Sequence, residues 1–378
     1  MHSIPLNALG QPVEPPLRQI PPELGSLADY ARLAQRHTEA SAWAHIESGA
    51  GQGLTLAHNR AALDRLLLQP EPLADLSQAS TALTLLGQPL AWPGLLAPVA
   101  YQRLVHPEGE LACARAAMAM RTAMAVSTLS SHPMEAIAQA AAAAADELGR
   151  RAPLWFQLYS QPERQHTLAL LRHAEDAGYQ ALMWTVDASI KRSSYPLPAG
   201  VEAANLRGLP QTRHNSDLMD EHILFGTPLA AQAPGWDELQ WLRGQTRLPL
   251  IVKGILSPRA ARRAVEMGAD ALVISNHGGR VLDGVVAPIE ALAGIRADVG
   301  PQVPLLLDSG VRQGVDIFKA LALGANAVMI GRPQLHALAV AGMAGVAHML
   351  HLLRAEFELA MAHMGCARLD QIGPACLR

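Results

Sequence analysis

Residues 268–280 have the sequence Gly-Ala-Asp-Ala-Leu-Val-Ile-Ser-Asn-His-Gly-Gly-Arg. A glycine of the kind that ends helices precedes a short apolar run, and polar residues follow that run directly. The same pattern of glycine and then an apolar run occurs at Gly178–Ala181 and at Gly324–Ala327. A helix end followed at once by a buried strand is the unit from which α/β folds are built.

Short apolar runs of this kind recur along the chain and lack the alternation of a half-exposed strand, so they are typical of parallel strands buried on both faces. Helical segments separate them, for example at residues 133–148, 164–177, 258–267 and 314–323. Eight strand–helix units predict a closed (β/α)8 TIM barrel, with a doubly wound open sheet as the alternative. The predicted strands are Leu95–Ala97, Ala123–Val126, Leu154–Leu158, Ala181–Val186, Leu250–Val252, Ala271–Ile274, Leu305–Leu307 and Ala327–Ile330.

The rest of the chain surrounds this barrel. Residues 1–25 are rich in proline and predict an extended arm, and residues 26–378 form one barrel domain. Helical patterns from Leu27 to Leu68 predict an N-terminal helical extension. The longest interruption, at about residues 188–235 after the fourth strand, holds five prolines and predicts a lid.

Composition narrows the class of protein. The chain of 378 residues is 50% hydrophobic with a net charge of -3, which suits a soluble enzyme and argues against nucleic acid as a partner. Its three cysteines form no CxxC pair, so we expect a cytoplasmic protein. The apolar stretch Ala82–Ala100 contains prolines and glycines, which favour two short strands around Gly87-Gln88 over a membrane span.

The active site of a (β/α)8 barrel lies at the carboxyl ends of its strands. In this chain the apolar runs end repeatedly in polar, titratable or glycine residues, a pattern that structural need alone rarely produces. We therefore expect the site to be built from Pro98, Val99, Ala100, Ser127, Gln157, Tyr159, Thr185, Asp187, Lys253, Ser275, His277, Asp308, Ser309, Gly310, Arg312, Gly331 and Arg332.

The strongest motif is Ser275–Arg280. His277 can accept a proton at neutral pH, and Arg280 offers a planar fork that holds a carboxylate in two hydrogen bonds. Asp187 could orient the histidine ring and stabilise its protonated form. The alternatives are a surface histidine in a turn and an aspartate that caps a helix.

Charge at the other strand ends indicates anionic ligands. Lys253 follows an apolar run and needs an anionic partner, either a reduced flavin or a neighbouring carboxylate of the barrel. The segments Asp308–Arg312 and Gly331–Arg332 combine glycines and arginines where barrels often bind phosphate, although ordinary turns could also explain them. No metal-binding motif is present: HExxH is missing, and His348 and His351 lack a third ligand.

These residues resemble the FMN-dependent 2-hydroxy acid oxidase and dehydrogenase family, which includes glycolate oxidase, lactate oxidase and mandelate dehydrogenase. The resemblance runs from about Asp29 to Ile372 and is carried by Ser48-Gly49-Ala50, His106–Glu110, Leu250–Gly254, Ser275–Arg280, Asp308–Ala325 and Gly331-Arg332-Pro333.

The resemblance implies FMN as cofactor and a homotetramer. It implies that His277 is the base with Asp187 as its partner, that Arg280 and Tyr159 bind the substrate, and that Lys253 lies at the flavin N1. By the same resemblance, Ala100, Ser127, Gln157 and Thr185 line the isoalloxazine, while Asp308, Arg312, Gly331 and Arg332 hold the ribityl phosphate end.

The chain departs from the family pattern around the substrate. His45 stands where the family places a carboxylate-binding tyrosine, and Ser194 stands where it places a second carboxylate-binding arginine. Arg192 or Lys191 could substitute if the loop is shortened. Leu129 occupies a further position that varies in size among relatives. We therefore expect an intact flavin site and an altered substrate site that includes His45, Leu129 and Arg192.

We expect the enzyme to oxidise an L-2-hydroxy acid to the 2-oxo acid, with oxygen or a quinone as final acceptor. One alternative is a member of the same family that acts on a larger or non-carboxylate α-hydroxy compound. Another is a non-catalytic FMN-binding barrel, against which the joint presence of His277, Asp187, Lys253 and Arg280 speaks.

Overall fold

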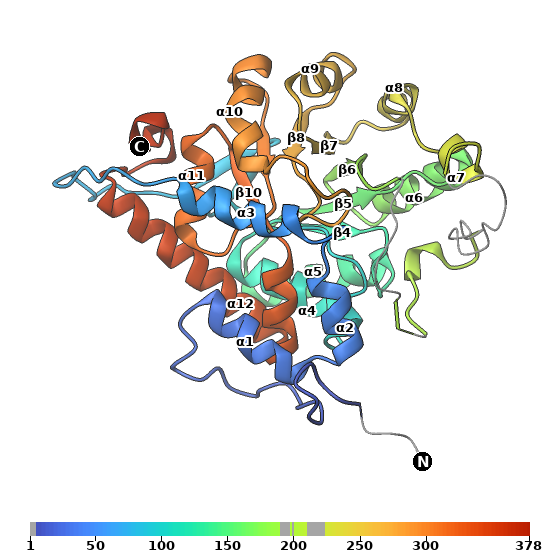
Figure 1. Ribbon diagram of the computed structural model, residues 1–378, viewed down its shortest axis with the longest axis horizontal. Coiled ribbons are helices and arrows are strands. Elements are labelled where there is room, and N and C mark those ends of the chain that lie inside the picture. The colour runs from blue at the N-terminus through green and yellow to red at the C-terminus, as the bar shows by residue number, and fades with distance from the viewer. Residues whose placement is uncertain (1–4, 190–196, 199, 210–223) are drawn as a thin grey trace.

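The computed structural model describes residues 5–189, 197–198, 200–209 and 224–378. Eight parallel strands form a closed barrel in which the last strand pairs with the first, so the predicted fold is confirmed (Figure 1). Seven strands agree with the predicted runs to within one residue, and β7 continues three residues further and so includes Lys253. The strands are β3 Gly94–Leu96, β4 Met124–Ser127, β5 Leu154–Leu158, β6 Ala181–Thr185, β7 Leu250–Ile255, β8 Ala271–Ile274, β9 Leu305–Leu307 and β10 Ala327–Ile330.

The barrel strands are apolar throughout because both of their faces are buried. Alternate residues such as Trp155, Met183 and Ile251 fill the barrel interior, while Phe156, Leu182 and Val252 belong to the outer core beneath the helices. The helices of the barrel are α4 Gly109–Met120, α5 Met134–Leu148, α6 Arg164–Asp176, α8 Trp236–Gln245, α9 Pro258–Glu266, α10 Pro288–Val299, α11 Gly314–Ala322 and α12 Arg332–His363.

Helix α12 is the one helix among the described residues that is long and apolar enough to cross a membrane. It is kinked at Ala341 and Gly342, 67% of its most apolar window is buried, and it packs against α4, α11 and the N-terminal helix α1 (Leu27–His37). Such burial is typical of a core helix. The stretch Ala82–Ala100 contains short strands, as predicted, and no helix.

The N-terminal extension contains α1, α2 (Ala40–Glu47) and α3 (Leu54–Arg65), preceded by residues 5–25 without a helix or a regular strand (Figure 1). Of the predicted lid, the structure describes the 3-10 turn η2 (Ala204–Leu206) and the short helix α7 (Pro228–Ala231). Further 3-10 turns are η1 Gln102–Leu104, η4 Leu369–Gln371 and η5 Pro374–Cys376.

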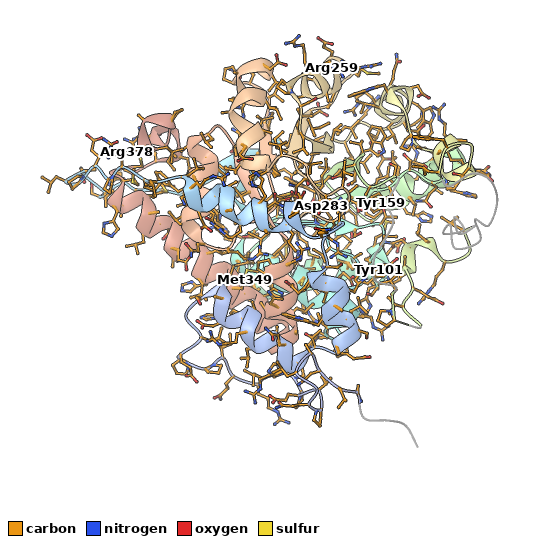
Figure 2. All side chains as sticks on the ribbon, in the orientation of Figure 1. Tyr101, Tyr159, Arg259, Asp283, Met349 and Arg378 are labelled. Atoms are coloured by element: carbon orange, nitrogen blue, oxygen red, sulfur yellow. The ribbon has the colours of Figure 1, made fainter. Side chains whose placement is uncertain are left out.

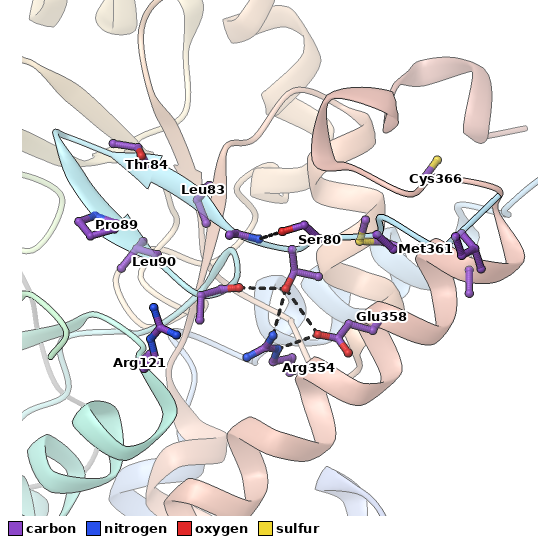
Figure 3. A pocket seen from close by; sticks show the side chains of 16 residues that line it. Ser80, Leu83, Thr84, Pro89, Leu90, Arg121, Arg354, Glu358, Met361 and Cys366 are labelled. Carbon is purple, nitrogen blue, oxygen red and sulfur yellow. Dashed lines mark hydrogen bonds and ion pairs between the residues drawn. The ribbon is translucent and has the colours of Figure 1, made fainter. Parts of the chain in front are cut away.

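A two-stranded hairpin, β1 (Leu83–Leu85) and β2 (Gln88–Leu90), closes the amino end of the barrel. Its Gln88 side chain accepts a bond from Trp155 and donates to the carbonyl of Gln180, both at the start of barrel strands. A cavity of about 670 Å³ lies here, between the hairpin and α12 (Figure 3). The cavity lies at the opposite end of the barrel from the predicted catalytic residues, which are at the carboxyl ends of the strands.

Candidate active site

His277 and Asp187 meet at the carboxyl end of the barrel, on the loops that follow β8 and β6. Nδ1 of the imidazole lies 3.0 Å from Oδ1 of the carboxylate. Burial alone would raise the pKa of Asp187. The His277 ring and Lys253 lower this pKa by more than burial raises it, so it lies below the usual value. An ionised carboxylate keeps the imidazole proton on Nδ1. Nε2 then has the lone pair of a general base, and it lies 3.5 Å from the hydroxyl of Tyr159.

The local backbone places His277 in this position. Three consecutive residues, His277, Gly278 and Gly279, have positive φ angles of 58°, 67° and 72°. The Ser275 hydroxyl accepts the His277 backbone N–H at 3.0 Å and helps to hold this turn. On β7, a Cβ atom at Gly254 would lie 2.6 Å from the Asp187 side chain, so glycine is required for the carboxylate to approach.

Lys253 is almost fully buried within β7, two residues before the strand ends, and it pairs with a carboxylate of the barrel. Nζ lies 2.9 Å from Oδ2 of Asp308 and donates to the Ser275 hydroxyl at 2.8 Å. Burial lowers the pKa of Lys253, but Asp308 and Asp187 raise it more, so the ammonium stays charged. Asp308, expected at the phosphate end, thus neutralises Lys253, and its second bond comes from the Ser309 hydroxyl.

Buried polar atoms without partners line the neighbouring strand ends. Nε2 of Gln157 on β5 and Oγ1 of Thr185 on β6 make no hydrogen bond to any described residue, although both atoms are buried. The side-chain carbonyl of Gln157 accepts a hydrogen bond from the Ser127 hydroxyl at 3.2 Å, and this bond fixes the orientation of the side-chain amide. Since buried polar groups are nearly always bonded, these atoms indicate a ligand with hydrogen-bonding edges, as the isoalloxazine ring of FMN has.

Arg312 and Arg332 form a buried cationic site at the next strand ends. Burial lowers the pKa of each to about 10, and neighbouring cations add to the effect: Arg332 acts on Arg312, and Arg280 acts on Arg332. Glu47 contributes negative charge, but its carboxylate also pairs with His336 at 2.9 Å. Arg332 donates to the backbone carbonyls of Ile46, Gly278 and Ser48, and Arg312 to that of Val311. Neither guanidinium forms an ion pair with a described carboxylate, so the two positive charges fit a phosphate. The site can therefore hold the phosphate of FMN, as the sequence predicts.

We expect phosphate and FMN to stabilise the flavin-free protein through this arginine pair. At one hundred times its Kd, FMN should add about 2.7 kcal/mol to the free energy of unfolding, and Tm should rise by a few degrees. Inorganic phosphate should give a smaller rise, and Arg312→Leu should remove that rise. Thermal unfolding checks this, with chloride at the same ionic strength as control. An equal response to chloride would contradict the assignment.

Arg280 extends from the same loop as His277 toward the end of α2. Its Nη1 donates to the backbone carbonyls of His45, Ile46 and Ser48 at 2.9, 2.9 and 3.2 Å. These carbonyls are the negative end of a helix, which a cation stabilises. Burial lowers the pKa of Arg280 below its usual value. Nε and Nη2 make no hydrogen bond within the described chain, so this edge of the guanidinium can hold a carboxylate.

The remaining predicted residues are placed as follows. His45 is half-buried beside Arg280, and Leu129 is half-buried on the loop after β4. Arg192, Lys191 and Ser194 lie outside the described residues. Half-buried loop residues after β3 are Pro98, Val99 and Ala100, and turns after β9 and β10 hold Ser309, Gly310 and Gly331.

Sequence reasoning missed three residues near the site. Glu47 faces the arginine pair, Tyr101 directly follows Ala100, and Glu110 is fully buried and bonded to the loops after β3 and β4. Glu110 belongs to the His106–Glu110 motif and could have been found from it. Tyr101 carried no signal beyond its position after a strand end, labelled in Figure 2.

The comparisons agree with this geometry. The model of the family "FMN-dependent dehydrogenase" matches residues 34–378. The chain is 46% identical to an L-lactate oxidase of Alicycliphilus denitrificans, over 96% of this chain and 100% of that protein. It is 41% identical to a 4-hydroxymandelate oxidase of Amycolatopsis orientalis, over 93% and 96%.

A crystal structure of mandelate oxidase with benzoyl-formic acid matches with a TM-score of 0.81 at 39% identity, over 94% of this chain and 98% of that one. Fold and site thus define a flavin-dependent oxidoreductase built on a (β/α)8 barrel. The chain belongs to the FMN-dependent dehydrogenase family, and FMN is its cofactor.

Proposed function

We propose that this enzyme oxidises an L-2-hydroxy acid to the 2-oxo acid with His277 as the base. The observation that carries the proposal is the arrangement of Asp187, His277 and Tyr159, joined at 3.0 and 3.5 Å, beside Arg280. Relatives named for the oxidation of lactate and 4-hydroxymandelate support the same class of substrate.

Each side chain has a distinct task. Arg280 holds the substrate carboxylate, Tyr159 hydrogen-bonds the substrate, and together they direct its Cα–H. His277 accepts a proton at Nε2, and Asp187 stabilises the imidazolium that forms. FMN, when bound, accepts the two electrons. Lys253 places a positive charge where negative charge would gather on the reduced cofactor, which is electrostatic preorganisation.

Anaerobic bleaching of the flavin absorbance near 450 nm tests this function. The panel runs from glycolate and lactate to mandelate and bulkier 2-hydroxy acids, each with its amide and ester. We expect rapid bleaching by at least one free acid. A flavin that no acid bleaches would contradict the proposal.

A second candidate substrate is a larger or uncharged α-hydroxy compound. The observation in its favour is that Nη1 of Arg280 already donates to three backbone carbonyls. Bleaching by amides or esters faster than by the acids would select this candidate.

Oxygen is the proposed electron acceptor, because the relatives compared above are named oxidases. We further propose a cytoplasmic homotetramer. Stoichiometric hydrogen peroxide from air-saturated turnover, and a mass near four times 40.2 kDa by light scattering, are the expected results.

A further inference from the structure

Tyr101 has a backbone conformation that tyrosine rarely adopts. Its φ and ψ angles are 54° and 46°, in the left-handed region. Its N–H donates to the carbonyl of Leu129 at 3.0 Å, and its carbonyl accepts the N–H of Leu104 at 2.9 Å. Such strain persists only where surrounding contacts impose it, and it gathers at functional sites.

Glu110 holds the residue that follows Tyr101 in the chain. Its carboxylate is fully buried and accepts the N–H of Gln102 at 3.0 Å and the N–H of Ser131 at 2.9 Å. It therefore ties the loop after β3 to the loop after β4. Tyr101 and Leu129 are held together at the barrel's carboxyl end as a result.

The Tyr101 phenol interacts electrostatically with Tyr159, whose hydroxyl lies 3.5 Å from His277 (both tyrosines are labelled in Figure 2). Burial raises the pKa of Tyr101, so the hydroxyl keeps its proton at neutral pH. The group is thus a neutral hydrogen-bond donor close to the site of proton transfer.

A substrate carboxylate needs more donors than Arg280 alone can supply here. An ionised carboxylate has about four acceptor positions. The Nη1 group of Arg280 is directed to backbone carbonyls, which leaves its Nε–Nη2 edge. The Tyr159 hydroxyl, 3.5 Å from His277 Nε2, is one further donor to the substrate. Tyr101 is a second phenolic donor within electrostatic range of Tyr159.

We propose that the Tyr101 hydroxyl donates a hydrogen bond to the substrate carboxylate, beside Arg280 and Tyr159. Tyr101 is then a substrate-binding residue of this enzyme. The inference rests on the proposed function, since it assumes a 2-hydroxy acid in the site.

The test compares Tyr101→Phe with the wild type, both loaded with FMN. Oxalate is titrated into each, and its Kd is taken from the flavin absorbance change and from calorimetry. A bond to a charged acceptor predicts a Kd about 10- to 100-fold weaker in Tyr101→Phe. In turnover, KM for the acid should rise by a larger factor than kcat falls. The decrease in kcat/KM caused by Tyr101→Phe should be larger for the acid than for its amide.

Tyr30→Phe is the control, because it removes a tyrosine hydroxyl that bonds His348, outside the site. It should bind oxalate like the wild type. Should Tyr101→Phe lose its flavin, Tyr101→Met removes the same hydroxyl.

An oxalate Kd within threefold of the wild type would overturn the proposal, and so would an equal loss for acid and amide. If no 2-hydroxy acid reduced the flavin of the wild-type enzyme, the proposed function itself would be wrong. The two failures are therefore distinguishable.

Discussion

His277→Gln lowers the rate of flavin bleaching by a 2-hydroxy acid about 10²- to 10⁴-fold while FMN stays bound. This range is what a positioned general base contributes. Glutamine keeps a polar side chain beside Asp187 but cannot accept a proton at neutral pH. The rate is measured by stopped-flow absorbance, and FMN content by the absorbance of the purified protein.

The chain offers a matched control for this substitution. His58 pairs with Glu290 at 2.7 Å, as His277 pairs with Asp187, but on the exposed side of α3 and α10. His58→Gln should therefore leave the rate unchanged. If His277→Gln bleached within threefold of the wild type, His277 would not be the base.

The fold could be predicted because barrel strands are buried on both faces. Strands such as β5, with Trp155 inside and Phe156 outside, are continuously apolar and end abruptly in polar residues. Because the active site of such a barrel lies at the carboxyl ends of its strands, the sequence alone indicated His277, Asp187 and Lys253, without any knowledge of contacts. The sequence was sufficient to predict those strands and site residues whose pattern lies within a few neighbouring positions.

Contacts between distant segments could not be predicted in the same way. Lys253 on β7 pairs with Asp308 after β9, with β8 between them, and the sequence left the lysine's partner open between a flavin and a carboxylate. Arg280 binds carbonyls at the end of α2, and a backbone acceptor leaves no mark on residue identity. The strained Tyr101 was missed because left-handed backbone is expected of glycine.

Lys253→Met should have a large effect on stability as well as on chemistry. It leaves the Asp308 carboxylate buried without its cation, and breaking a buried pair from one side costs about 3–5 kcal/mol. The free energy of unfolding of the flavin-free protein, from urea titration, measures this loss. Lys319→Met is the control: Lys319 is also buried, but it bonds the Leu63 carbonyl and should cost less.

The pH dependence follows from the sign of the shift. The pKa of Lys253 is raised in the folded protein. Its stabilising contribution is therefore complete below the usual lysine pKa of about 10.4 and is lost only as pH rises through the folded pKa. The difference between wild type and Lys253→Met should stay constant from about pH 6 to 9. A loss that disappears toward pH 9 would contradict the ion pair.

A double variant separates the two roles of the lysine. Lys253→Met with Asp308→Leu replaces both charges by apolar groups, which is often neutral or stabilising. Stability should then recover, because no unpaired charge remains buried. Flavin reduction should stay slow, because the positive charge that stabilises the reduced cofactor is still missing. If the double variant recovered its rate as well, Lys253 would serve the fold alone.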